Sequence, residues 1–481
     1  MQHQDGSRGS RRWVVLTSLA GLTGAVMAAC GSDAPAAPVP PTKAAGSAPS
    51  PANTAVPAAT AKPAIAPTME PSKSKPSVKI TFWQYQDVPS TELFQKYVDA
   101  FNAEGRGSTI QHDRVEGAKK APAVAANSMP DLDLSNPNHP AQFAALNGGM
   151  VALDTFIRKQ GPDGIPQAEY LPAPWGLYTW KRKQYGIPLQ AAIKNFIYNK
   201  DVFAEVGIAK LPTTWDDFVG AGKKVVQKEG TVWKRSFLNM NTDLNRTWHE
   251  FSYRNNTKRV TDDLTKSLVN SPESIQTLQY LVDLAHVHGL QPKPEEYAPE
   301  TVDFTTGRSA AHWGGFQNAT AILKANPALK LGTLLIPYGP TPAKVTGIAG
   351  ECLSMWDSSK DRDAAFQFIR YMCYDRNLAW CKDYFIVPVR KADLLDPYYQ
   401  SELMAPVVET LQSHVYLRWM YDLGNTFPHA AKFASAITTA CKEAYTLQKS
   451  VKQALDGAAD AHNALLSQYG SELKQFLADQ A

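Results

Sequence analysis

The segment 183–208, KQYGIPLQAAIKNFIYNKDVFAEVGI, decides the fold prediction. The apolar run 195–198 predicts a buried strand, and a short helix is expected directly after it, over 201–206. Gly207 follows at the position where glycine commonly ends a helix, because glycine adopts the left-handed conformation without steric cost. A strand, a short helix and a glycine stop in this order are typical of an α/β protein.

The alternation of strands and helices continues on the N-terminal side of this segment. Residues 78–83, VKITFW, alternate in polarity and predict a first strand. Residues 91–103 predict an amphipathic helix, because apolar side chains recur at helical spacing (Leu93, Phe94, Tyr97, Val98 and Phe101). Residues 129–134, MPDLDL, predict a short buried strand, and a threonine of the segment 212–218 predicts the N-cap of a further helix. We therefore expect an α/β head.

The first 29 residues are typical of an export signal. Arg11 and Arg12 precede an apolar run that is near the lower length limit for crossing a bilayer. Residues 27–30, MAAC, place small residues before Cys30, which resembles the cleavage site of a bacterial lipoprotein, where the cysteine carries the lipid. The paired arginines favour the twin-arginine export route. A plain signal peptide in which Cys30 has no role is the alternative.

Residues 30–76 are expected to comprise the lipidated cysteine and a tether. The 46 residues from 31 to 76 contain eleven prolines and no aromatic residue, so they cannot bury enough apolar surface to offset the entropy lost on folding. A coil of this length spans roughly 35–40 Å, which would let a globular head move over the membrane surface. A glycosylated stalk is the alternative for this composition.

The remaining residues, from about 77 to 481, have the composition of a globular protein. Of the whole chain, 44% is hydrophobic, and the net charge of +4 gives no electrostatic basis for binding nucleic acid. Export allows a disulfide, whereas folding in the cytosol before export favours free buried thiols. We expect no metal and no cofactor, because the cysteines after Cys30 lack the spacing of a zinc site (Cys352, Cys373, Cys381 and Cys441).

The sequence lacks the motifs of common hydrolases, including the G-x-S-x-G nucleophile elbow. Asp131 and Asp133 lie two residues apart on a predicted strand, which would place both carboxylates on one face as an acid–base pair. The alternative is structural, with Asp131 capping a turn after Pro130. We expect a binding protein and no enzyme; a secreted lipoprotein enzyme acting on polysaccharide is the alternative function.

Several segments, in order along the chain, resemble family 1 of the extracellular solute-binding proteins of ABC importers, the group that contains maltose-binding protein. The segments are ITFWQYQD (80–87), MPDLDL (129–134), KQYGIPLQ (183–190), FIYNKDVFAEVGI (196–208), PTTWDDF (212–218), GRSAAHWGGF (307–316), SSKDRDAAFQFIRYM (358–372), IVPVRKA (386–392) and SVKQALDGAADAHNALL (450–466). Together they cover nearly all of the head.

The resemblance implies a periplasmic-binding-protein-like type II fold, in which two α/β lobes are joined by hinge strands with the ligand cleft between them. Lobe 1 is expected to comprise residues 77–190 and 348–397, and lobe 2 residues 191–347 and 398–481. The chain is expected to cross between the lobes near 189–193, 345–350 and 396–401. Cleft closure would be a hinge motion.

The resemblance also implies where the ligand binds. Trp83, Gln84, Tyr85 and Asp87 follow the first strand and offer the ring faces and polar groups that a sugar requires. The other expected ligand-binding residues are Ser135, Asn138, Gln190, Trp313 and Phe316. Ser135 and Asn138 stand where maltose-binding protein has an aromatic residue and a carboxylate, so we expect a specificity other than for maltodextrin. Ordinary core packing is the alternative for each aromatic residue.

The function implied by the resemblance is capture of a small solute, most simply a mono- or oligosaccharide, for an ABC permease. The protein is expected to be a monomer held at the extracytoplasmic face of the membrane by its lipid alone, with no nucleic-acid partner. A solute sensor without a transporter is a further alternative.

Overall fold

The computed structural model describes residues 78–86, 88–135, 149–240, 244–299, 303–315, 317–418 and 427–480. All of them belong to one compact unit, Pro71–Ala481. The predicted export signal, Cys30 and the tether lie outside the described residues.

The first sheet has five strands in the order β2-β1-β3-β13-β6. β1 pairs in parallel with β2 and β3, and β13 pairs antiparallel with both β3 and β6. A strand from late in the chain, β13, is therefore inserted between two strands from its first half, β3 and β6. The strands are β1 (Val78–Gln84), β2 (Ser108–Arg114), β3 (Leu132–Ser135), β6 (Gly186–Pro188) and β13 (Cys352–Met355).

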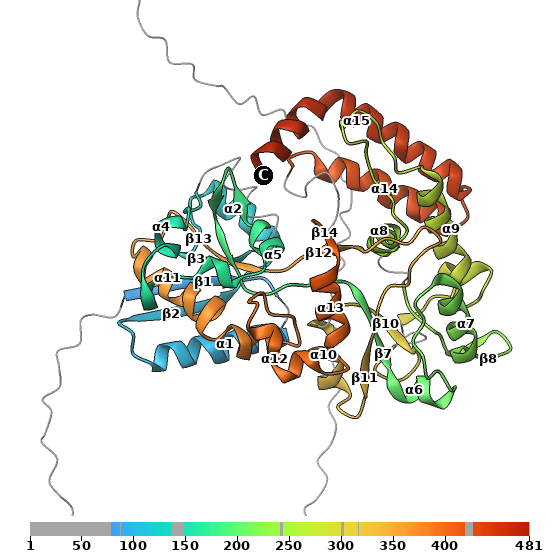
Figure 1. Ribbon diagram of the computed structural model, residues 1–481, viewed down its shortest axis with the longest axis horizontal. Coiled ribbons are helices and arrows are strands. Elements are labelled where there is room, and N and C mark those ends of the chain that lie inside the picture. The colour runs from blue at the N-terminus through green and yellow to red at the C-terminus, as the bar shows by residue number, and fades with distance from the viewer. Residues whose placement is uncertain are drawn as a thin grey trace, which may run out of the picture. The chain divides into compact units, whose positions relative to one another are not determined.

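Aromatic rings fill the space between this sheet and its helices. Helices α1 (Val88–Ala103) and α11 (Arg362–Arg370) lie along the sheet (Figure 1). Phe82 of β1 contacts Phe94 of α1 and Phe368 of α11, with ring centroids 5.6 and 5.4 Å apart. All three side chains are buried, and tilted contacts of this kind are favourable between aromatic rings.

The predicted elements of this region are present, with shifted ends. The helix expected over 91–103 begins at Val88, and the strand expected over 129–134 begins only at Leu132. Pro130 has no N–H to donate to a sheet. The carboxylate of Asp131 instead accepts from the backbone N–H and the hydroxyl of Thr81, at 2.8 and 2.7 Å.

The second sheet is antiparallel and has β7 (Asn195–Asn199) at its centre, between β10 (Ala311–Gly314) and β11 (Leu331–Leu334). The predicted strand in the segment 183–208 is thus the middle strand of a sheet. The side chain of Asn199 caps α6 (Lys200–Glu205), because it accepts from the N–H groups of Asp201 and Val202. The helix expected over 201–206 is therefore confirmed, one residue earlier.

Helices surround the second sheet. Thr214 caps α7 (Trp215–Val225) and forms a capping box with Asp217, which confirms the predicted N-cap. The other helices here are α8 (Leu244–Arg254) and α9 (Pro272–His286). Helix α10 (Gln317–Ala325) follows β10 in the chain. Two C-terminal helices, α14 (Ala430–Tyr445) and α15 (Val451–Gln480), run side by side in Figure 1 and pack against α8 and α9.

Two segments that link the sheets pair with each other. The first leads from β6 to β7 and the second from β12 (Val345–Ile348) to β13. The N–H of Leu189 donates to the carbonyl of Glu351 at 2.8 Å, and Ala192 and Ala349 exchange bonds of 2.8 and 2.9 Å. The two segments, at 189–192 and 349–351, lie where crossings were expected. We call them the paired crossing segments.

The two cores divide the head into two lobes, as expected of the α/β fold, with one departure. The first core is built around the five-stranded sheet and the second around β7 and helices α7 to α9. Buried residues of α10 (Ala319 and Ile322) and of α13 (Ala405–Ser413) belong to the first core, although the expected boundaries put them in lobe 2. The third expected crossing, 396–401, contains the turn Pro397–Gln400. The lobe boundaries stay a prediction.

The remaining elements are short. They are α2 (Lys120–Ala125), α4 (Asp154–Ile157), α5 (Pro172–Gly176), β4 (Thr179–Trp180), β5 (Lys183–Gln184), β8 (Gln227–Glu229), β9 (Val232–Arg235), α12 (Asn377–Asp383) and β14 (Val415–Arg418), which pairs with β12.

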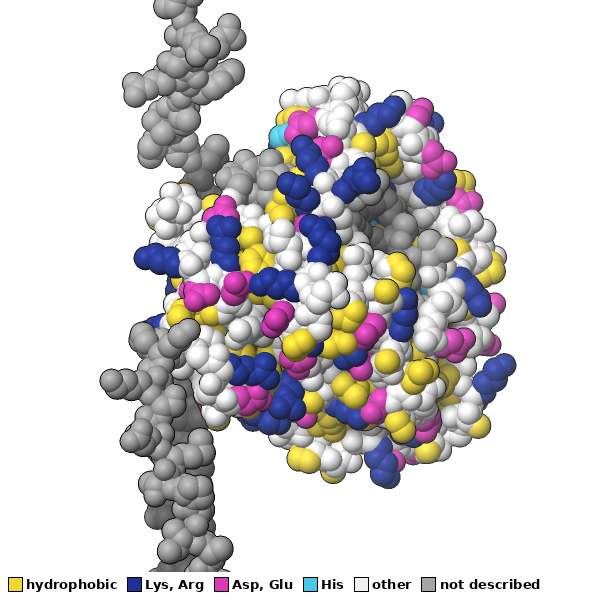
Figure 2. Space-filling model, turned by 60° about the vertical axis from the view of Figure 1, so that its left-hand side comes forward, with side chains coloured by type: hydrophobic (Ala, Val, Ile, Leu, Met, Phe, Trp, Pro, Cys, Tyr) yellow, Lys and Arg dark blue, Asp and Glu magenta, His cyan; other side chains and the backbone are white. Residues whose placement is uncertain are grey.

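The surface carries both positively and negatively charged side chains. On the face drawn in Figure 2, basic and acidic side chains are interspersed. Ion pairs account for part of this pattern, for example Lys96 with Asp383 at 2.7 Å and Lys159 with Asp363 at 2.5 Å.

The cysteines of the head are buried thiols. In the described part of the chain, none of them forms a disulfide (Cys352, Cys373, Cys381 and Cys441). Burial raises the pKa of the Cys373 thiol and raises that of Cys441 to about 12, so both stay protonated. Within the same residues, no helix has the length and apolar character to cross a membrane, and no group of three or more His, Cys, Asp or Glu side chains could hold a metal ion.

Three histidines predict a loss of stability in mild acid. Burial lowers the pKa of His312 to about 4 and that of His414 to about 4, and burial together with Arg259 holds the pKa of His249 well below its usual value. The unfolded chain binds protons at these groups below about pH 6.5, whereas the folded protein does not. The free energy of unfolding should therefore fall as the pH goes down from about 6.5 toward 4.

We expect the melting temperature to decrease between about pH 7 and about pH 5. The amide oxygen of a His312→Gln variant can accept the bond that Asn318 donates to His312 Nε2 at 2.7 Å. This variant should therefore lose less stability over the same range. Equal losses in variant and parent would contradict the assignment to His312.

Candidate functional site

The candidate site lies where the first sheet meets the paired crossing segments. β1 and β3 run parallel, so their carboxyl ends meet at one edge of the sheet, with Trp83 in register with Asp133. Trp83 is partly exposed at this edge, and Tyr85 and Gln86 continue into the loop that follows β1.

A buried glutamine holds this loop in place. Gln84 is fully buried, and its Nε2 donates to Thr91 Oγ1 at 2.6 Å while its Oε1 accepts from the N–H of Gln86. Arg114 Nε donates to the Gln86 carbonyl at 2.7 Å from β2. Gln84 was expected to contact the ligand; the structure instead places it behind the loop, with both ends of its amide bonded within the chain.

The carboxylate of Glu351 accepts hydrogen bonds from three side chains at the site. Tyr85 Oη donates to Glu351 Oε1 at 3.4 Å, Gln86 Nε2 donates to the same oxygen at 3.0 Å, and Gln190 Nε2 donates to Oε2. Glu351 and Gln190 come from the two paired crossing segments, and Tyr85 and Gln86 from the loop after β1. The carboxylate thus joins three separate parts of the chain.

A buried ion pair lies under Tyr85. Lys120 Nζ is 2.7 Å from Asp133 Oδ1 and also donates to the Leu134 carbonyl at 2.9 Å. Both charged side chains are at most 2% exposed. Ser135 Oγ donates to Asp133 Oδ2 at 2.9 Å, and Lys120 Nζ lies 4.8 Å from the centre of the Tyr85 ring. A desolvated cation over an aromatic face is a favourable contact.

The environment shifts the ionisation of these groups. Burial raises the pKa of Glu351, while the three donors and the charge of Lys194 act against this shift. Burial and the neighbouring Glu351 carboxylate raise the pKa of Tyr85, so its hydroxyl stays protonated and donates. Burial also raises the pKa of Asp133, against the effect of Lys120.

The other predicted ligand-binding residues differ in position: some are buried, and others lie outside the described residues. Gln190 is 3% exposed, and its Oε1 accepts from Trp380 Nε1 at 2.9 Å. Ser135 is fully buried. Trp313 is 7% exposed and packs on Phe196 in the second core, with ring centroids 5.1 Å apart. Three predicted residues lie outside the described residues, namely Asp87, Asn138 and Phe316.

Two residues at the site were missed by sequence reasoning. Glu351 precedes a short apolar strand, and Lys120 lies in an alanine-rich segment, so neither position stands out in the sequence. A glutamate at 351, directly after the expected crossing at 345–350, was the available signal for Glu351. For Lys120 we find no signal: Asp133 is only 13 residues away, but nothing in the sequence shows that Lys120, and not the neighbouring Lys119, turns toward it.

The proposed acid–base pair does not form. Asp131 accepts from Thr81, and Asp133 is paired with Lys120. Each carboxylate therefore has its own structural contacts, which favours the structural interpretation of the MPDLDL segment.

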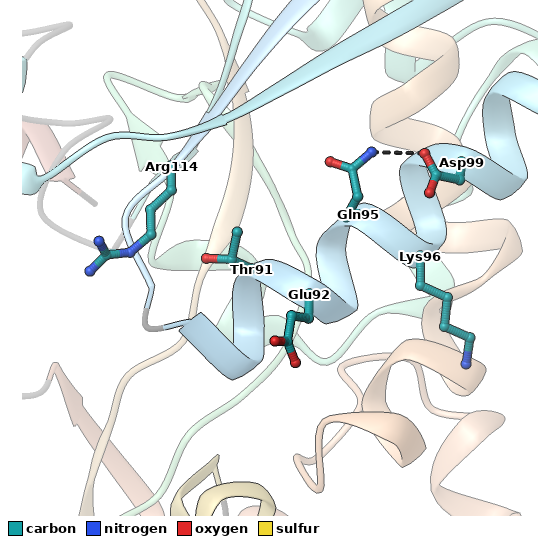
Figure 3. Close-up of a pocket in the computed structure, with 6 residues that line it drawn as sticks. All are labelled: Thr91, Glu92, Gln95, Lys96, Asp99 and Arg114. Carbon is teal, nitrogen blue, oxygen red and sulfur yellow. Dashed lines mark hydrogen bonds between the residues drawn. The ribbon is translucent and has the colours of Figure 1, made fainter. Parts of the chain in front are cut away.

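Several hollows lie elsewhere on the surface of the described residues. Figure 3 shows one of about 720 Å³, lined by α1 side chains, among them Gln95 bonded to Asp99, and by Arg114 of β2. Its Glu92 already pairs with Lys324, at 3.1 Å. Two more, of about 520 and 590 Å³, lie beside Trp215. None of these three includes Glu351 or its donors.

Removal of one partner of the buried pair should be costly. Lys120→Met leaves the Asp133 charge buried and unpaired, so we expect the free energy of unfolding to fall by about 3–5 kcal/mol. Adding Asp133→Leu removes the stranded charge and should recover most of this loss. Urea denaturation measures both. Lys119→Met is the control, because this lysine is 69% exposed and should change stability by less than about 1 kcal/mol. A double variant as unstable as the single one would contradict the pairing.

Comparison with known proteins agrees with this architecture. Residues 96–406 match the sequence profile of the bacterial extracellular solute-binding proteins. The diacetylchitobiose binding protein of Streptomyces coelicolor is 27% identical over 270 residues, which cover 54% of this chain and 60% of that protein.

Solved structures show the same fold. An ABC substrate-binding protein of Listeria monocytogenes, in complex with cycloalternan, has a TM-score of 0.67 at 19% identity and covers 81% of this chain and 99% of its own. The cyclic alpha-maltosyl-1,6-maltose binding protein of Arthrobacter globiformis has a TM-score of 0.62 at 25% identity and covers 82% of this chain and all of its own. With most of its length matched by the profile, the chain belongs to the bacterial extracellular solute-binding protein family.

Proposed function

We propose that this protein captures a mono- or oligosaccharide outside the cell and delivers it to an ABC import permease, while a lipid on Cys30 anchors it to the membrane. The chemistry of the residues around Glu351 is the observation that carries the choice of a sugar. Sugars offer hydroxyl groups to polar side chains and C–H faces to aromatic rings. Trp83 and Tyr85 supply rings, and Gln86 and Glu351 supply an amide and a carboxylate.

Two relatives support a sugar as the solute. The protein from Streptomyces coelicolor is named for diacetylchitobiose, and the Listeria protein is in complex with cycloalternan. The alternative of a polysaccharide-cleaving enzyme loses its candidate residues, because Asp131 and Asp133 are held in separate structural contacts. Transport requires a permease, whereas sensing does not. Cells that lack this protein should therefore lose sugar uptake if it serves transport, and should keep it if the protein is only a sensor.

The test of sugar binding is a comparison of two tryptophans. Trp83→Ala should weaken the affinity about thirtyfold, since truncation of an aromatic hot spot costs on the order of 2 kcal/mol. It should leave the melting temperature nearly unchanged, because Trp83 is partly exposed. Trp313→Ala should instead lower the free energy of unfolding by about 3–5 kcal/mol, because Trp313 packs in the second core.

Calorimetric titration with a panel of oligosaccharides and a melting curve of each variant provide both measurements. Normal affinity of the Trp83→Ala variant would show that this ring does not contribute to binding. A stable Trp313→Ala variant with weakened binding would indicate that Trp313 contacts the ligand.

Lipid anchoring is tested at one residue. Cys30→Ala should release the protein from the membrane, because one lipidated cysteine is the proposed anchor. Cell fractionation followed by immunoblotting measures this, with Cys441→Ala as the control, since that thiol is buried in the second core. A Cys30→Ala protein that still sediments with membranes would place the anchor elsewhere.

A further inference from the structure

The carboxylate of Glu351 is only partly used by the protein. An ionised carboxylate has about four positions at which it can accept a hydrogen bond. In the described part of the chain, three donors occupy them, from Tyr85, Gln86 and Gln190. Glu351 as a residue is partly exposed, and these three donors leave about one acceptor position of the carboxylate unused.

The three donors are themselves held in place. Gln190 is fixed at its other end by Trp380, the backbone of Gln86 is fixed by Arg114, and the ring of Tyr85 lies over Lys120. Because each donor has a second contact, the orientation of the carboxylate is set before any solute arrives. A pre-oriented acceptor binds a hydroxyl without the cost of ordering it first.

We propose that Glu351 determines specificity by accepting a hydrogen bond from a solute hydroxyl, and that it thereby selects neutral sugars over sugars that carry a carboxylate or phosphate at that point. The inference rests on the proposed function. An ionised carboxylate or phosphate presents only acceptors to Glu351, so no hydrogen bond forms and two like charges are brought together. The neighbouring cation Lys194 weakens this repulsion, but an ionised Glu351 still has no proton to donate to a uronate or a phosphate.

The two ends of the network act differently on selectivity. The Glu351 carboxylate contacts the solute directly, whereas the Tyr85 hydroxyl and the Gln190 amide position that carboxylate through their bonds to it. A change at Glu351 should therefore alter which solutes bind. A change at Tyr85 that keeps the ring should alter how tightly they bind and keep the order of preference.

The experiment measures affinities for neutral trisaccharides of glucose, mannose and galactose against triglucuronate and trigalacturonate. The parent should bind at least one neutral trisaccharide more tightly than the acidic ones. Glu351→Gln should bind that sugar about tenfold or more weakly, since the hydrogen bond to a charged acceptor becomes one to a neutral amide oxygen. It should also narrow the preference for neutral sugars, because its amide N–H can donate to a uronate. Tyr85→Phe should weaken binding with the preference kept. Glu229→Gln, whose side chain is 74% exposed on β8, is the control and should match the parent.

The possible results separate this inference from the function on which it rests. A parent that prefers uronates, or a Glu351→Gln variant with the affinity and preference of the parent, would overturn the role of Glu351 while leaving sugar binding intact. A folded parent that binds no sugar of either kind would overturn both. The parent's own preference needs no variant, so the test stands even if Glu351→Gln does not fold.

Discussion

The hydrogen bonds between the paired crossing segments are the contact on which the rest of the head depends. They tie 189–192, which leads from β6 to β7, to 349–351, which leads from β12 to β13. Gly350 makes this pairing possible, because a Cβ at that position would lie 2.2 Å from the carbonyl oxygen of Gln190. The same pairing brings the side chains of Gln190 and Glu351 together, so the connection between the lobes also builds the candidate site.

The site combines this connection with a buried charge. Lys120 and Asp133 are withdrawn from water, which is costly unless each finds partners. Lys120 meets Asp133, the carbonyl of Leu134 and the ring of Tyr85. The pair therefore links the carboxyl end of β3 to the loop after β1. A rigid base of this kind suits a binding site, because ordering its loops in advance lowers the cost of binding.

Local patterns in the sequence predicted the elements of the fold well and their ends less well. Periodic burial revealed β1, α1 and β7, since a buried face imposes apolar residues at fixed spacing. The late start of β3 depends on the contact of Asp131 with Thr81, which lies on another strand. For the site, the region after β1 was predicted, but Gln84 and Ser135 were found behind the surface. Residue type shows what a side chain can bond to and does not show which way it points.

The sequence by itself determined the α/β class, the order of strands and helices, and the family resemblance, because these follow from periodicity and from segments in a fixed order. Only the tertiary structure decided that α10 and α13 pack with the first core and that Trp313 is buried in the second. It also decided the partners of Glu351. The physical reason is distance along the chain: Tyr85 and Glu351 are 266 residues apart, and only the packing of the whole head brings such groups within reach of each other.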